Sequence, residues 1–407
     1  MIYLFVRLCE EELRALGLYD SFEVARHITF RAALAALTAF LTWVLLGPRA
    51  IAWLRARFRD RISERSPEIA ALSQSKIETP TMGGLFILAA MLGASLLWAD
   101  LASGYVLVGV LTALWLGGVG AADDYLKLSR GSPGTQLTWS PPASRQPDTG
   151  VARGKDASAF AAPDDQGPHE QQDGLSVKEK LALQTVLGLL VGGFLYFHQG
   201  NTTDGLKISL PLVGIEGSLG VWLVPLAALV IVASSNAVNL TDGLDGLAGG
   251  CMVFAGAAFV VVSYLAGHAV LAEYLGVPYL PGSGELCVLL AAMTGAVLGF
   301  LWHNCHPAAV FMGDTGSLPL GGLIGYAAVV TRQEFLLVLV GGVFVLEAAS
   351  VLVQVGSFKL TGRRVLRCAP LHHHLQLLGW HENQIVVRMW IAAAVLALVA
   401  VATLRLV

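Results

Sequence analysis

The sequence predicts an all-α polytopic membrane protein with about ten transmembrane helices. Hydrophobic residues make up 55% of the 407 residues, charged residues only 14%, and the mean hydropathy is +0.65. A soluble domain carries about 25% charged residues, so a large soluble α/β enzyme with buried strands fits poorly. A helix that crosses a hydrocarbon core about 30 Å thick needs roughly 20 apolar residues. Apolar runs of about this length lie at residues 32–48, 81–99, 101–122, 181–197, 220–238, 246–267, 286–302, 316–331, 335–356 and 386–404.

The loops between these runs differ in charge, which predicts an orientation in the membrane. Alternate loops, at residues 47–80, 123–180, 239–245, 303–315 and 357–388, hold nineteen of the 26 Lys and Arg residues. An excess of these residues marks the cytoplasmic side. Because ten crossings is an even number, both termini are predicted to lie on the non-cytoplasmic side.

One of these basic loops contains an unusual segment, residues 131–174. It holds six of the sixteen prolines and few aliphatic residues. Such a segment cannot bury enough apolar surface to offset its ordering entropy. We therefore predict one membrane domain, with helices 1–3 in residues 1–130 and helices 4–10 in residues 175–407, interrupted by a disordered cytoplasmic insertion. A partner-binding segment is the alternative.

Four polar motifs lie in the loops predicted to be cytoplasmic. Their polar residues are Asp123, Asp124 and Lys127 in "DDYLK"; Asn239, Asp242 and Asp245 in "NLTDGLDG"; Asn304, His306 and Asp314 in "HNCHPAAVFMGD"; and His372, His373 and His374 in "APLHHHLQ". A carboxylate within the bilayer costs about 2.5–3.5 kcal/mol even on a lenient scale. A solvated loop acid or a helix cap explains any one of these residues, but not four motifs on one face. We predict that the carboxylates gather at the interface and face water or a cation.

Several carboxylates near a lysine are typical of phosphoryl transfer assisted by Mg²⁺. This ion prefers carboxylate oxygens and takes its other ligands from water and substrate phosphates. The "GDTGS" segment, residues 313–317, places backbone N–H groups at the start of a predicted helix, where anions bind. No GxxxxGK[ST] motif occurs, so a P-loop NTPase is unsupported. The three histidines suggest zinc, but adjacent residues on a helix point about 100° apart and cannot all bind one ion.

A set of longer motifs resembles a known family. The segments "ITFRAALAALTAF", "TPTMGG", "DDYLK", "NLTDGLDGLAGG", "FMGDTGSLPLGG" and "APLHHHLQLLGWHENQIVVRMW" occur in this order. Together they resemble the phospho-N-acetylmuramoyl-pentapeptide transferases, which belong to the polyprenyl-phosphate N-acetylhexosamine-1-phosphate transferases (glycosyltransferase 4 type). The resemblance covers the chain apart from residues 131–174. It implies ten transmembrane helices, Mg²⁺ as cofactor and a homodimer in the bacterial cytoplasmic (inner) membrane, without a nucleic-acid partner.

The resemblance also implies a reaction. Phospho-N-acetylmuramoyl-pentapeptide moves from UDP-N-acetylmuramoyl-pentapeptide to undecaprenyl phosphate, giving lipid I and UMP, in the first membrane step of peptidoglycan synthesis. Direct attack and a covalent aspartyl intermediate both stay open. We expect direct attack, because the lipid phosphate is already a competent nucleophile.

Roles carry over residue by residue. Asp314 matches the Mg²⁺ ligand and Asp123 the acid proposed to deprotonate the lipid phosphate, with Asp124 beside it as a third catalytic residue. Phe311 matches the aromatic residue that stacks on uracil, and Lys76 the lysine near that base. The substrate-binding positions are Lys76, Lys127, Asn239, Asp242, Asp245, Asn304, Phe311, His372, His373 and His374.

Departures from the family pattern, and two alternative functions, are also visible. Glu78 stands where the family usually has glycine, and "ALSQSK" lacks the Ser-His pair that the family has upstream of this position.

A sister enzyme that transfers N-acetylglucosamine-1-phosphate would share the aspartate motifs, but "PLHHHLQLLGW" favours the muramoyl-pentapeptide branch. A polytopic transporter would carry polar residues deep inside several spans, whereas mainly Glu347 and Gln354 are found, on one helix.

Overall fold

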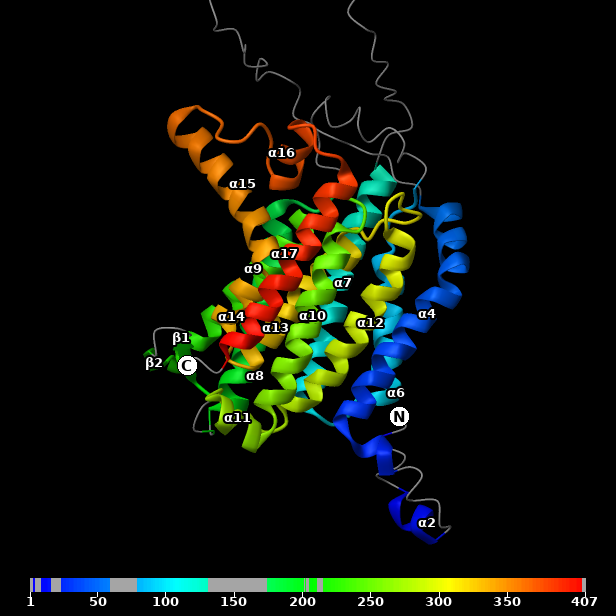
Figure 1. Ribbon diagram of the computed structural model, residues 1–407, viewed down its shortest axis with the longest axis vertical. Coiled ribbons are helices and arrows are strands. Elements are labelled where there is room, and N and C mark those ends of the chain that lie inside the picture. Colours follow the sequence, from blue (N-terminus) through cyan, green and yellow to red (C-terminus); the bar gives the residue numbers. More distant parts are fainter. Residues whose placement is uncertain are drawn as a thin grey trace, which may run out of the picture.

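Long helices packed side by side form the protein, and a computed structural model shows their arrangement (Figure 1). It describes residues 3, 9–15, 23–58, 79–130, 174–200, 202, 205–210 and 215–404. The long elements are α4 (Ile28–Arg57), α6 (Gly84–Trp98), α7 (Gly104–Arg130), α8 (Val177–Gln199), α9 (Leu223–Thr241), α10 (Leu247–Ala266), α12 (Leu286–Asn304), α13 (Asp314–Val330), α15 (Gly342–Thr361) and α17 (Glu382–Thr403). The short elements are α2 (Glu10–Ala15), η1 (Val24–Arg26), β1 (Lys207–Leu210), β2 (Ile215–Ser218), η3 (Gly220–Trp222), α11 (Ala269–Leu275), η4 (Ser283–Glu285), α14 (Glu334–Val340) and α16 (Leu371–Leu377).

Each predicted apolar run coincides with helical structure. Within the described residues, eight helices are long and apolar enough to cross a membrane, which confirms a helical, multi-pass membrane protein. Of the other two runs, 81–99 forms a shorter helix than predicted, because α6 has 15 residues, while α13 has 17 and covers all but the last residue of run 316–331. All residues of α13 from Thr315 to Val330 are buried, so this helix meets protein on every side. The ninth run is interrupted at Gly341, which separates α14 from α15.

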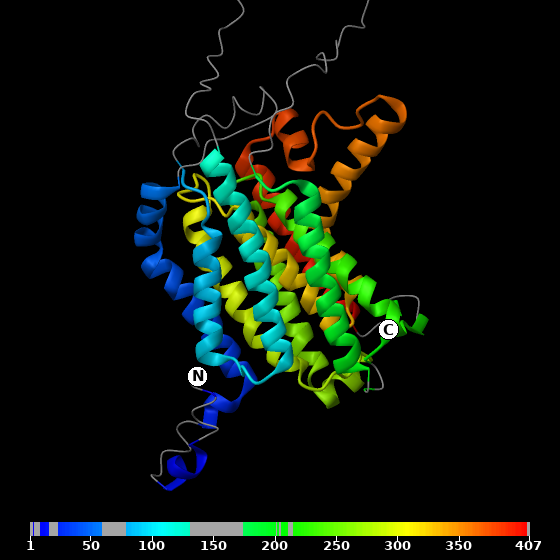
Figure 2. The same cartoon turned by 180° about the vertical axis from the view of Figure 1, so that it is seen from behind.

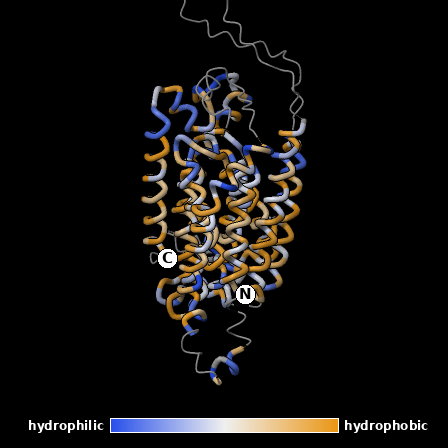
Figure 3. The backbone as a smooth tube through the Cα atoms, turned by 90° about the vertical axis from the view of Figure 1, so that its right-hand side faces the viewer, coloured by the Kyte–Doolittle hydropathy of each residue, from blue (hydrophilic) through white to orange (hydrophobic). Residues whose placement is uncertain are grey.

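The bundle has two distinct ends. Both chain termini lie toward one end, where the antiparallel β1–β2 hairpin also lies (Figure 1). At the other end, α15 leans away from the bundle and α16 returns toward it, and the view from behind shows α7 and α8 ending and beginning at this same end (Figure 2). Apolar residues dominate the middle of the bundle, and polar residues concentrate toward its ends (Figure 3).

Glycines allow the helices that carry the motifs to approach closely. A Cβ atom on Gly84 would lie 2.1 Å from the backbone nitrogen of Gly316, and one on Gly120 would lie 2.2 Å from the carbonyl oxygen of Asp314. Small residues let helix backbones meet within a membrane. As a result, α6 and α7 both pack against the start of α13, and the "DDYLK" and "FMGD" motifs meet.

Candidate active site

Three carboxylates meet where α7 ends and α13 begins. Asp123 and Asp124 lie in the last two turns of α7, and Asp314 is the first residue of α13. Each offers one oxygen atom, and these atoms all lie within 4.8 Å of one another. Asp123 is completely buried and Asp124 is 5% exposed. Carboxylates held this close repel each other unless cations compensate them.

Two lysines supply positive charge to this cluster. The Nζ atom of Lys127 lies 2.7 Å from Oδ2 of Asp123 and 3.4 Å from Oδ2 of Asp314. The Nζ atom of Lys180 lies 2.6 Å and 2.8 Å from the same two oxygen atoms. Both ammonium groups therefore bridge Asp123 and Asp314, although the two aspartates belong to different helices.

Sequence reasoning did not select Lys180. This residue lies in the first turn of α8, where Ser176 and Glu179 form a capping box. The adjoining backbone N–H of Leu175 donates to Oδ1 of Asp123 at 2.7 Å. The available signal is the Ser-x-x-Glu pattern before an apolar run, which marks a helix start. It places Lys180 at the same end of the bundle as the "DDYLK" motif.

Replacing Lys180 with Met should lower turnover about ten- to 150-fold, because a hydrogen bond to a charged group contributes about 1.5–3 kcal/mol. The methionine keeps most of the side-chain volume but leaves Asp123 and Asp314 with one ammonium partner fewer. Initial rates of the purified variant measure the effect. Lys178→Met, two residues earlier on an exposed position, is the matched control. Equal rates for both variants would contradict a role for Lys180.

Asp124 holds the beginning of α13 in place. Its carboxylate accepts hydrogen bonds from the backbone N–H of Thr315 at 2.9 Å, from the Thr315 hydroxyl at 2.7 Å and from the backbone N–H of Asp314 at 3.2 Å. Gly313 has φ 72°, and a Cβ atom there would lie 2.6 Å from Oδ2 of Asp124. These contacts favour a positioning role for Asp124, as the N-terminal cap that orients Asp314.

The "NLTDGLDG" motif adds polar groups from the end of α9. Nδ2 of Asn239 donates to Oδ1 of Asp314 at 2.8 Å and to the Ser317 hydroxyl at 2.9 Å. Desolvation, followed by repulsion from the carboxylates of Asp314 and Asp124, raises the pKa of Asp242 from 3.8 to about 7. Desolvation and these neighbouring carboxylates both favour the protonated form of Asp242.

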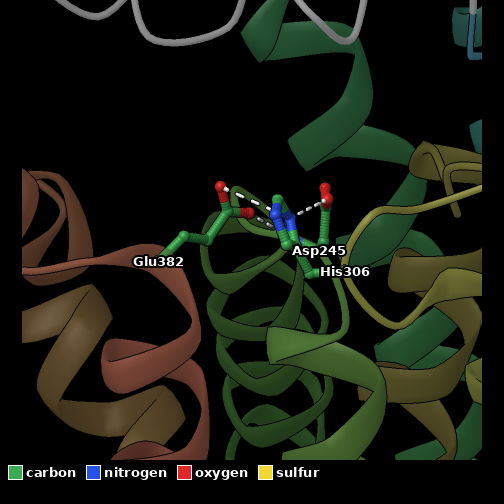
Figure 4. Close-up of side chains that lie close together, drawn as sticks. All are labelled: Asp245, His306 and Glu382. Atoms are coloured by element: carbon green, nitrogen blue, oxygen red, sulfur yellow. Dashed lines mark hydrogen bonds and ion pairs between the residues drawn. The ribbon is translucent and has the colours of Figure 1, made fainter.

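Asp245, His306 and Glu382 form a second polar cluster. Nδ1 of His306 lies 2.9 Å from Oδ2 of Asp245 and 4.0 Å from Oε2 of Glu382, at the start of α17 (Figure 4). Asn304 supports this loop, because Oδ1 accepts from the backbone N–H of Gly246 at 3.0 Å and Nδ2 donates to the Val310 carbonyl at 2.8 Å. Both ends of the Asn304 amide are thus used within the protein. The sequence places His306 among the polar residues of its motif but assigns it no role, and it does not single out Glu382.

Comparison with known proteins identifies the family. The model of glycosyl transferase family 4 matches residues 161–332. The chain is 42% identical over 391 residues to the phospho-N-acetylmuramoyl-pentapeptide-transferase of Desulfotalea psychrophila, and 40% identical over 405 residues to that of Koribacter versatilis. A Geobacter relative of the same name is 42% identical over 390 residues, and each of the three matches covers 95% of this chain and 96% of the relative. The chain belongs to the phospho-N-acetylmuramoyl-pentapeptide transferase family.

The three histidines in the motif of this transferase have different hydrogen-bond partners. His372 is completely buried, and its Nδ1 lies 3.1 Å from Oε2 of Glu347 in α15. Nδ1 of His373 lies 2.8 Å from Oε1 of Gln376, and Nδ1 of His374 accepts from the backbone N–H of Arg367 at 3.2 Å. The Nδ1 atoms of the three rings thus have separate partners, although the ring centroids of His372 and His373 lie 4.3 Å apart. His372 supports the "NLTDGLDG" loop, because a Cβ atom on Gly243 would lie 2.3 Å from its Nε2.

Two further predicted positions of the transferase lie in the loops before α6 and α13. The backbone N–H of Phe311 donates to the Pro80 carbonyl at 2.8 Å, and the Phe311 carbonyl accepts from the N–H of Gly83 at 2.8 Å. The "TPTMGG" and "FMGD" motifs are therefore paired through their backbones. Lys76, like Glu78, lies outside the described residues, as do residues 131–173 of the insertion.

Proposed function

We propose that this chain transfers phospho-N-acetylmuramoyl-pentapeptide from UDP-N-acetylmuramoyl-pentapeptide to undecaprenyl phosphate, forming lipid I and UMP. One structural observation carries the proposal: three carboxylates and two lysines converge at one end of a bundle of apolar helices. An end of this kind can receive a lipid phosphate from the membrane and a nucleotide-sugar from water. The names of the relatives support the same reaction.

The donor set at this end fits Mg²⁺. The three aspartates offer carboxylate oxygens within 4.8 Å of one another, and such oxygens are the ligands that Mg²⁺ prefers. Asp314 would hold the ion, with Asp123 beside it. When bound, Mg²⁺ would neutralise charge on the diphosphate of the nucleotide-sugar.

The protein's own residues accept the proton, stabilise the charge of the phosphates and orient Asp314. Asp123 accepts the proton of the lipid phosphate, whose oxygen then bonds to the phosphorus attached to the sugar. The bond from that phosphorus to UMP breaks, and UMP leaves with the electron pair. Lys127 and Lys180, whose ammonium groups lie at this cluster, stabilise the charge of the phosphates. Asp124 and Asn239 keep Asp314 oriented.

The orientation in the membrane follows from the same arrangement. We propose ten crossings, with the active site at the cytoplasmic face and both termini on the opposite side. Support comes from the position of both chain ends away from α16 (Figure 1) and from the Lys and Arg excess in the loops at the site. The bacterial inner membrane and a homodimer complete the proposal and rest on the resemblance alone.

A direct assay tests the function. Purified protein, UDP-N-acetylmuramoyl-pentapeptide, undecaprenyl phosphate and Mg²⁺ should release UMP and form lipid I. The same mixture with UDP-N-acetylglucosamine in place of the muramoyl donor should release no UMP. UMP release with the second donor alone would instead support the N-acetylglucosamine-1-phosphate alternative.

The two polar residues that would support the transporter alternative, Glu347 and Gln354, both have structural partners within the protein. Glu347 binds His372. Gln354 accepts hydrogen bonds from the backbone N–H groups of Val365 and Leu366 at 3.1 Å and 2.9 Å. Both side chains support the loop that leads to the histidine motif, which is a structural use rather than a transport path.

Replacing residues 132–173 with a four-residue Gly-Ser linker should leave turnover within a small factor of the unmodified protein. Long disordered loops cost little to close, since each doubling of length adds about 0.6 kcal/mol. Gly174 and Leu175, which contact Asp123, are retained. The UMP assay measures the effect, together with trypsin cleavage at Arg145, Arg153 or Lys155 in the intact protein. An inactive but folded linker variant would indicate an ordered, functional insertion.

A further inference from the structure

We propose that Asp245, His306 and Glu382 form a second cation site, suited to a transition ion such as Zn²⁺ and distinct from the aspartate cluster. The three ligands come from three parts of the chain: the loop after α9, the loop after α12 and the first turn of α17 (Figure 4). One oxygen from each carboxylate and a ring nitrogen of the histidine lie within 4.8 Å of one another.

Two distances between these atoms lie on either side of the spacing found in a tetrahedral site. Bonds of about 2.0–2.1 Å to Zn²⁺ require ligand atoms about 3.3–3.4 Å apart. The Nδ1 atom of His306 lies 2.9 Å from the Asp245 oxygen and 4.0 Å from the Glu382 oxygen, so the observed distances bracket that value.

Backbone groups hold both carboxylates toward the imidazole. The N–H of Ala308 donates to Oδ2 of Asp245 at 3.2 Å, and the N–H of Asp245 donates to Oε1 of Glu382 at 3.0 Å. The second bond leaves Oε2 of Glu382 facing His306 (Figure 4). Supporting contacts of this kind orient ligands in metal sites. The His306 side chain is 37% exposed, so an ion can enter from solvent.

The donor types separate this site from the aspartate cluster. Imidazole nitrogen suits Zn²⁺, Cu²⁺, Fe²⁺ and Ni²⁺, whereas a site made only of carboxylates suits Mg²⁺ and Mn²⁺. The aspartate cluster also contains two ammonium groups, from Lys127 and Lys180. An ion that prefers nitrogen therefore binds at His306, and it displaces the Nδ1 proton as it binds.

The site has a consequence for the enzyme, which rests on the proposed function. Asp245 matches a pocket residue for the nucleotide-sugar, and its carboxylate is one of the three that raise the pKa of Asp242. An ion that takes Asp245 as a ligand removes it from the substrate pocket. Zn²⁺ should therefore inhibit turnover at fixed, saturating Mg²⁺.

Binding is tested first, without substrates. Purified full-length Asp314→Asn, which weakens the aspartate site, is titrated with Co²⁺ as a spectroscopic probe for Zn²⁺. Visible d–d absorption that saturates at one ion per chain and is displaced by Zn²⁺ is expected. Adding His306→Phe or Glu382→Gln should weaken binding at least tenfold, while adding His268→Asn, at the start of the distant α11, should not. Equal Co²⁺ binding in all four proteins would overturn the proposal.

Inhibition is tested second, with each protein compared with its own zinc-free rate. Zn²⁺ should inhibit the unmodified enzyme, and His306→Phe should need at least tenfold more Zn²⁺ for the same fractional inhibition. Inhibition that is identical in both proteins would overturn the assignment. An active transferase that binds no Co²⁺ at His306 would remove this inference and leave the proposed function intact, whereas Co²⁺ binding by a chain without transferase activity would do the reverse.

Discussion

Replacing Asp314 with Asn should abolish turnover and leave the protein folded. Asp314 is the carboxylate on which Lys127, Lys180 and Asn239 converge. Asn retains the volume and the oxygen that accepts from Asn239, but it removes the negative charge. Loss of several kcal/mol of charge stabilisation at the phosphates corresponds to a rate at least about a thousandfold lower.

The measurement is UMP release at saturating Mg²⁺, with thermal unfolding in detergent as the check on folding. Asp100→Asn is a control, because Asp100 is buried and lies before α7 at the opposite end of the bundle. Its Oδ1 accepts from the backbone N–H of Ala102 at 3.0 Å, and Asn preserves that bond. Retention of more than a few per cent of turnover by Asp314→Asn would contradict the assignment.

Replacing Asp123 with Asn should lower turnover about 10²–10⁴-fold, the usual cost of losing a general base. Asn can still accept the hydrogen bond from the Leu175 N–H, which Asp123 accepts at 2.7 Å, so the fold should survive. The Mg²⁺ concentration needed for half-maximal rate should change less than for Asp314→Asn. Full activity of the Asp123→Asn variant at neutral pH would contradict the general-base role of Asp123.

The pH dependence of the Asp123→Asn variant separates two accounts of the same loss. If Asp123 removes the proton from the lipid phosphate, the variant should regain activity at high pH, where that proton is lost to solvent. If Asp123 instead serves to hold Lys127 and Lys180 in place, the deficit should stay constant as pH rises. Rates measured from pH 6 to 9 distinguish the two outcomes.

Much of the protein could be predicted from local patterns. The apolar runs predicted where every long helix lies, because a helix in lipid must satisfy its backbone internally and present apolar side chains to its surroundings. The motif residues Asp123, Lys127, Asn239 and Asp314 were predicted to meet, and the structure brings them together. The exceptions were α6, which is shorter than predicted, and the ninth run, which is split at Gly341.

Contacts between distant residues required the tertiary structure. Lys180 lies 57 residues after Asp123 and 134 residues before Asp314, and no local pattern encodes that meeting. In the sequence, Asp124 is one of two apparently equivalent acids in "DDYLK". Packing of α7 against α13 makes it the cap of α13. The cluster of Asp245, His306 and Glu382 likewise joins three separate segments.

The sequence by itself therefore determined the membrane class, the helical runs, the family and the end of the bundle at which the polar motifs gather. The tertiary structure alone decided which carboxylate each lysine meets, which aspartate orients α13 and which residues form the second cluster. The physical reason is the distance along the chain over which each effect acts. Hydropathy and helix capping act within a few residues, whereas these partners are set by helix crossings, which depend on close glycine contacts such as Gly120 against Asp314.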